Sequence, residues 1–169
     1  MTMPMNSPVG SGSASAPSAA AFAAPPTALA LGLGCDRGTP LATLQQALQA
    51  ALVQAGARAS QVAAAASITL KADEVGLLAL AAEQGWSLAF YTPAQLAEVQ
   101  VPNPSETVRQ FTGTPSVSEA AALLAGAGVL GRAQALPMTA LLLEKFKYRD
   151  ADGRNATVSI ARCDRLLVS

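Results

Sequence analysis

The sequence contains no histidine among its 169 residues. This absence removes the usual general base near neutral pH, the serine–histidine and cysteine–histidine pairs of nucleophilic catalysis, and the commonest zinc ligand. Cysteine is scarce too: Cys35 and Cys163 lie too far apart in sequence to suggest a metal-binding motif or a disulfide framework. We therefore expect no metal and no cofactor, and a reducing cytoplasm is the simplest location for the protein.

Charge and aromatic side chains are also in short supply. Lysine plus arginine number 11 and so do aspartate plus glutamate, which leaves no net charge and no basic cluster. Because binding to phosphates needs clustered cations, nucleic acid is not an expected partner. No apolar run approaches the length of a membrane span, so we expect no membrane association. Alanine dominates the apolar residues, which predicts a core built by close approach of small side chains.

Residues 1–26 form a tract of Met, Pro, Ser, Gly and Ala without any Lys or Arg. The tract lacks the positively charged start of a signal peptide. Its composition predicts a disordered leader or an over-called start site. Residues 27–169 are expected to form one α/β domain.

The stretch Leu29–Pro40 reads as a buried strand, a glycine-rich turn and the start of a helix. We expect Thr39 to be the N-cap of that helix and Pro40 its first residue. Unpaired amides at the helix terminus, together with the guanidinium of Arg37, would form a site for an anion. The alternative is a connection that binds nothing.

Strand and helix patterns then alternate along the chain. We expect a helix from Leu41 to about Gly56, a helical turn over 60–65, and a helix with an apolar face from Leu77 to Ala82 that stops at Gly85. Strands are expected over 67–70 and 87–91. Further helices should open at Thr92, at Ser105 with its end at Gly113, and at a capping box over Ser116–Glu119 with its end near Gly126. Strands over 139–147 and 156–162 should be joined by the turn 150–153. This order predicts a three-layer α/β/α fold with a mainly parallel sheet and an antiparallel C-terminal hairpin.

Several segments taken in order resemble one known family. They are Gly32–Gly38, Ser67–Glu74, Pro104, Ser105, Val108, Gly113, Ser116–Ala122, Lys145 and Thr157–Arg162. Together they are similar to the CobE/CbiG C-terminal domain family of cobalamin biosynthesis, from about residue 29 to 162. The resemblance implies a three-layer α/β/α domain that acts on corrin-ring precursors. Proteins of the CbiG type open the ring-A lactone of cobalt-precorrin-5A and release acetaldehyde, whereas this chain is expected to be the stand-alone CobE-like form.

Corrin precursors carry acetate and propionate arms, so their site should offer cations and free amides. Arg37 can bind a carboxylate with two hydrogen bonds, and Lys71 and Lys145 can act as point charges. In an open α/β sheet, ligands sit beyond the carboxyl ends of the strands, where the turns with Arg37 and Lys71 lie. The expected substrate-binding residues are Gly34, Cys35, Arg37, Gly38, Thr39, Lys71, Ser105 and Lys145.

For some of these residues a structural role is the alternative. Asp73 or Glu74 could orient a cation or act as general base toward water, or Glu74 could complement the dipole of the next helix. Cys35 could be an activated thiolate or a buried structural thiol, and Ser105 a helix cap.

Three hypotheses on function follow. The first is a carrier or pathway chaperone for a precorrin or cobalt-precorrin intermediate. The second is a hydrolase that opens the lactone with Asp73 or Glu74. The third is a partner of another cobalamin-pathway enzyme that never contacts the corrinoid.

Overall fold

The computed structural model describes residues 27–164, and the predicted leader 1–26 lies outside them. The elements in chain order are β1 (Leu29–Cys35), α2 (Leu41–Ala55), β2 (Val62–Ile68), α3 (Val75–Gln84), β3 (Leu88–Tyr91), α4 (Pro93–Ala97), α5 (Glu106–Thr112), α6 (Val117–Val129), β4 (Leu141–Arg149) and β5 (Asn155–Arg162). Within residues 27–164, no helix is both long and apolar enough to span a bilayer.

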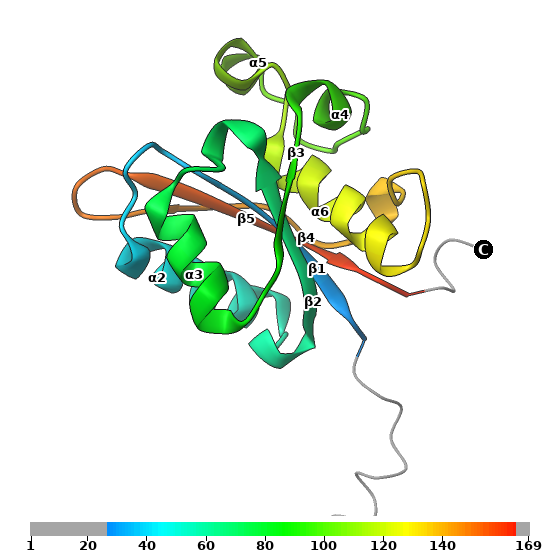
Figure 1. The fold of residues 1–169 in the computed structure, drawn as a ribbon, viewed down its shortest axis with the longest axis horizontal. Coiled ribbons are helices and arrows are strands. Elements are labelled where there is room, and N and C mark those ends of the chain that lie inside the picture. Colours follow the sequence, from blue (N-terminus) through cyan, green and yellow to red (C-terminus); the bar gives the residue numbers. More distant parts are fainter. Residues whose placement is uncertain (1–26, 165–169) are drawn as a thin grey trace, which may run out of the picture.

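The five strands form one mixed sheet in the order β3-β2-β1-β5-β4. Strands β1, β2 and β3 run parallel, and β5 pairs antiparallel with both β1 and β4. Helices α2 and α3 cover one face, α6 covers the other, and α5 projects beyond one end of the sheet (Figure 1). Each covered face has its own apolar cluster. The predicted α/β fold with a C-terminal hairpin is confirmed.

Side-chain size alternates along the central strand β1. Leu29, Leu31 and Leu33 face the cluster under α2 and α3. The opposite face carries small residues, and a Cβ built on Gly32 would lie 1.7 Å from the carbonyl oxygen of Ser118. Glycine is therefore required here, because α6 approaches β1 backbone to backbone. This approach places the N-terminus of α6 beside the carboxyl end of β1.

The predicted helical turn over 60–65 is wrong beyond Gln61. Residues Val62–Ile68 form strand β2, which pairs with β1 on one side and β3 on the other. The alanines of this strand favour helix locally, but burial between two strands and α6 overrides that preference. The predicted strand 67–70 is also wrong at its end, because Thr69–Lys71 form a 3-10 turn.

Two predicted features of α6 are wrong. The helix continues past Gly126 to Val129, because Gly126 serves close packing: its Cβ would lie 2.6 Å from Cδ1 of Leu136. The hydroxyl of Ser116 does not accept the backbone bond of a capping box. It donates instead to the carboxylate of Glu119 at 3.0 Å. By contrast, the predicted capping box at Thr92 and the cap at Ser105 are confirmed.

Candidate functional site

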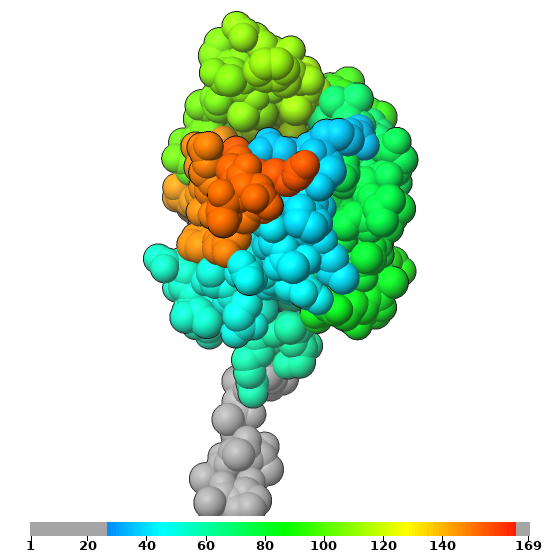
Figure 2. Space-filling view, turned by 90° about the vertical axis from the view of Figure 1, so that its left-hand side faces the viewer, coloured from blue at the N-terminus to red at the C-terminus, as the bar shows by residue number. Residues whose placement is uncertain are grey.

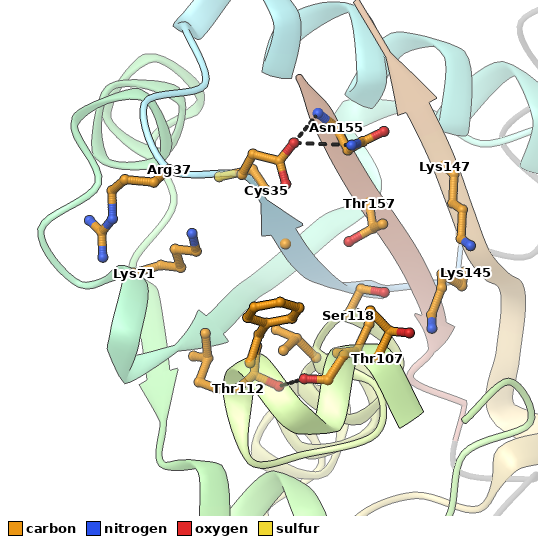
Figure 3. A pocket seen from close by; sticks show the side chains of 16 residues that line it. Cys35, Arg37, Lys71, Thr107, Thr112, Ser118, Lys145, Lys147, Asn155 and Thr157 are labelled. Carbon is orange, nitrogen blue, oxygen red and sulfur yellow. Dashed lines mark hydrogen bonds between the residues drawn. The ribbon is translucent and has the colours of Figure 1, made fainter. Parts of the chain in front are cut away.

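A hollow of about 560 Å³ opens at the carboxyl ends of β1 and β2. Its walls come from α5, the first turn of α6 and the β4–β5 hairpin (Figure 3). Of the residues expected from the sequence to bind substrate, Gly34, Cys35, Arg37, Lys71 and Lys145 line it. The tertiary structure thus brings together residues separated by up to about a hundred positions in the chain.

The hollow is cationic. All three lysines of the sequence, Lys71, Lys145 and Lys147, line it. Lys71 and Arg37 lie on one side, and Lys145 and Lys147 lie on the other (Figure 3). Lys145 is half-buried, its Nζ donates to the carbonyl oxygen of Asn103 at 3.0 Å, and burial lowers the pKa of its ammonium. Positive charge therefore flanks the space from two directions.

The guanidinium of Arg37 is held by two carboxylates and one backbone carbonyl of the protein. Nη1 lies 2.7 Å from Oδ1 of Asp73 and 3.1 Å from Oε2 of Glu74, and Nη2 donates to the carbonyl oxygen of Leu70 at 2.6 Å. The hydrogen bond between Arg37 and Asp73 raises the pKa of the guanidinium and lowers the pKa of the carboxyl. Arg37 thus joins the loop after β1 to the loop after β2. Because the charge of Arg37 is paired with two carboxylates, the positive charge that the hollow offers to a ligand comes mainly from Lys71, Lys145 and Lys147.

The terminus of α2 differs from the predicted anion site. The helix begins at Leu41, so Thr39 is not its N-cap; the Thr39 hydroxyl donates to the carbonyl oxygen of Asp36 at 2.7 Å. The backbone amide of Gly38 donates to Oε1 of Glu74 at 2.7 Å. The protein's own carboxylate therefore already occupies the place where an external anion was expected.

Asp73 and Glu74, the candidate catalytic carboxylates, do not line the cationic hollow. With Gly38 and Thr39 they border a second hollow of about 400 Å³ on the other side of Arg37. Glu74 is only 4% exposed, and it makes no side-chain cap on α3 because its carboxylate reaches the loop after β1. These contacts make both carboxylates partners of Arg37 and of the backbone.

Cys35 and Gly34 form part of the floor. Burial raises the pKa of the Cys35 thiol to about 11, and the nearby charge of Lys71 offsets only part of that effect. The thiol is therefore neutral near pH 7, as expected for a structural cysteine. A Cβ on Gly34 would lie 2.6 Å from Oγ1 of Thr157, so glycine keeps this floor open.

Ser105 acts through α5. Its hydroxyl accepts the amide of Val108 at 3.2 Å and caps the helix, and it does not line the hollow. The wall itself consists of α5 residues that sequence reasoning missed as a group: Thr107, Val108, Phe111 and Thr112. Their helical spacing places them on one side of α5, but no local signal predicts that this helix stands at the edge of the sheet. Lys147 was also missed, although residues two apart in a strand share a face with Lys145.

Glu119 is a second feature that the sequence did not reveal. Its side chain is fully buried, and its carboxylate accepts from Nδ2 of Asn103 at 2.6 Å, Oγ of Ser116 at 3.0 Å and the backbone amide of Lys145 at 3.0 Å. One carboxylate thus connects the segment before α5, the start of α6 and strand β4. Two of these elements, α6 and β4, line the hollow, and the third carries Asn103, whose carbonyl oxygen accepts from Nζ of Lys145.

Residues 29–161 match the family described as Cobalamin synthesis G C-terminus. The chain is 40% identical over 99 residues to the Cobalt-precorrin-5A hydrolase of Priestia megaterium, covering 59% of this chain and 26% of that protein. It is 41% identical over 102 residues to Protein CobE of Sinorhizobium sp, covering 59% of this chain and 66% of that protein. The chain therefore spans about a quarter of the length of the first relative and just under two thirds of the second.

Solved structures share the fold. A crystal structure of CobE, described as a protein from the cobalamin (vitamin B12) biosynthetic pathway, superposes with a TM-score of 0.67 at 32% identity, covering 85% of this chain and 96% of that one. The cobalamin biosynthesis protein chiG from Agrobacterium tumefaciens str. C58 superposes with a TM-score of 0.51 at 29% identity, covering 79% and 97% of the two chains.

Proposed function

Since this chain belongs to the Cobalamin synthesis G C-terminus family of cobalamin biosynthesis, we propose that it binds a precorrin or cobalt-precorrin intermediate in the cationic hollow and acts as a cytoplasmic carrier. The observation that supports this proposal is the gathering of Lys71, Lys145 and Lys147 around one space of about 560 Å³. A neutral chain with only three lysines has no general reason to place all of them together. A ligand with several carboxylate arms accounts for the arrangement.

Contacts between the lysines and the carboxylate arms do not supply enough binding free energy by themselves. A charge-assisted hydrogen bond contributes roughly 1.5–3 kcal/mol, and solvent reduces that value at half-exposed groups. With solvent reducing each value to the lower end of this range or below, three such contacts fall short of the roughly 8 kcal/mol that corresponds to micromolar affinity. The remainder would come from apolar contact with the ring, for which Val108, Phe111 and Val117 are available.

A carrier is favoured over a hydrolase by the position of the acidic side chains. Among the described residues that line the hollow, Asp36 alone carries a carboxylate. That carboxylate accepts hydrogen bonds from the backbone amide and the side-chain amide of Asn155 at 2.8 and 3.0 Å. Asp73 and Glu74 are held by Arg37 on the far side of the loop.

Lactone hydrolysis is the second candidate. It is suggested by the name of the relative from Priestia megaterium and by the burial of Glu74, whose Oε2 is paired with Nη1 of Arg37 at 3.1 Å. A role as partner of another pathway enzyme would need neither ligand nor catalysis.

A titration followed by visible absorbance tests the proposal, because corrin precursors are coloured. We expect a spectral shift that saturates, weakens with added salt, and is weakened by Lys71→Gln and Lys147→Gln by roughly tenfold each. The matched control is Arg58→Gln, which removes the same charge from an exposed site away from the hollow and should leave binding unchanged.

The same samples separate the three hypotheses. Binding without acetaldehyde release supports the carrier, whereas release that is lost in Glu74→Gln supports the hydrolase. The absence of any shift with several intermediates would refute ligand binding and leave only the role as a protein partner.

A further inference from the structure

Phe111 is exposed in a way that folding does not explain. Its side chain is 79% exposed, and helix α5, which carries it, buries none of its own residues. Figure 2 shows this yellow-green segment projecting beyond the body of the molecule, above the orange β4–β5 hairpin. The folded domain therefore gains little apolar burial from Phe111.

Helix α5 is nevertheless held in place at both ends. The backbone amide of Ser105 donates to the carbonyl oxygen of Pro115 at 2.9 Å, which closes the segment on itself. At the other end Gly113 adopts a φ of 82°, and a Cβ there would lie 3.1 Å from Cβ of Pro93. These contacts position Phe111 at the mouth of the hollow without burying it.

The hollow therefore has two kinds of wall. Val108 and Phe111, three residues apart on α5, face it together with Ile68 and Val117. The lysines described above supply the opposite chemistry at its sides. Among the described residues that line the hollow, Phe111 is the aromatic one. A ligand matched to both walls has a flat, conjugated centre and an anionic rim.

We propose that Phe111 is the contact for the face of the ligand ring, so that α5 selects a flat macrocycle over other polycarboxylates. This inference rests on the proposed function and adds a specificity-determining residue to the same site. The side chain touches the ring and not its arms, so its removal should discriminate between ligands that share carboxylates and differ in shape.

The experiment compares two probes. Uroporphyrin is a flat macrocycle with acetate and propionate arms, and butane-1,2,3,4-tetracarboxylate offers carboxylates without a ring. Uroporphyrin binding is followed by absorbance, and the tetracarboxylate is measured as a competitor. We expect Phe111→Ala to weaken uroporphyrin binding by about tenfold, as for loss of an aromatic stacking contact, and to leave the tetracarboxylate within twofold of wild type.

Two further variants complete the design. Phe111→Trp keeps a ring face and should keep the affinity for uroporphyrin. Val53→Ala, which alters a side chain that is 69% exposed and does not line the hollow, should change nothing. If the wild type binds uroporphyrin and Phe111→Ala binds it equally well, the ring contact is refuted while the proposed function stands. If the wild type takes up no uroporphyrin, the selection of a flat macrocycle by α5 is refuted, and the proposed function is decided separately by the titration with precorrin intermediates.

Discussion

Replacing Gly32 by alanine should push α6 away from the sheet. The new Cβ would lie 1.7 Å from the carbonyl oxygen of Ser118 and 2.6 Å from the backbone nitrogen of Ala122, whereas real Cβ contacts stay above 3.0 Å. Relief of the closer contact alone requires a displacement of at least about 1.3 Å, the difference between these distances. Both obstructing atoms are backbone, so a side-chain rotation cannot remove the clash.

The displacement would disturb a helix in which ten residues are buried. Overpacking a core usually costs about 1–3 kcal/mol, and backbone shifts fall at the upper end, so we expect a loss of about 3 kcal/mol in the free energy of unfolding. This is a large share of the roughly 5–15 kcal/mol that holds a typical domain together. The corresponding fall in Tm is roughly 6–12 °C.

Urea unfolding followed by circular dichroism measures this loss as a lower midpoint with an unchanged slope. The matched control is Gly128→Ala in the same helix, where no atom lies within 4 Å of the new Cβ. That variant should be neutral or up to about 1 kcal/mol more stable, because alanine favours helix over glycine. A change of less than about 0.5 kcal/mol for Gly32→Ala would refute the close approach of α6 to β1.

Two other predictions concern buried groups. Burial raises the pKa of Cys35 from 9.0 to about 11, so the folded protein holds the thiol proton more tightly than the unfolded chain does. The resulting contribution to the free energy of unfolding is fully present below pH 9 and is lost as the pH rises toward 11. Alkylation of Cys35 in the folded protein, measured by peptide mass spectrometry, should therefore rise over that interval, and a rate at neutral pH equal to that of the unfolded chain would contradict the prediction. Glu119→Ala should cost about 3 kcal/mol in urea unfolding, because buried donors on three elements lose their acceptor. Glu144→Ala, which removes an exposed carboxylate bonded to the same Asn103, is the control, and equal losses would argue against a special role for Glu119.

Local patterns predicted much of the fold. The glycine stops at Gly56, Gly85 and Gly113 all adopt left-handed conformations after helices, and the turn at 150–153 joins the closing hairpin. These features depend on residues within a few positions of one another, so they can be predicted from the local sequence. Strand β2 was misread because its alanines carry no strand preference of their own, and burial between neighbours decides their conformation.

Some residues of the candidate site could likewise be predicted from the sequence, and others could not. The sequence by itself determined that cations follow the first two strands and that another, Lys145, lies in the closing hairpin. Only the tertiary structure decided that Lys147 joins them, that α5 forms a wall, and that Glu74 reaches the amide of Gly38 from 36 residues away. Pairing between distant side chains depends on where whole elements dock. Docking is set by the packing of faces such as the glycine side of β1 against α6, which no short stretch of sequence contains.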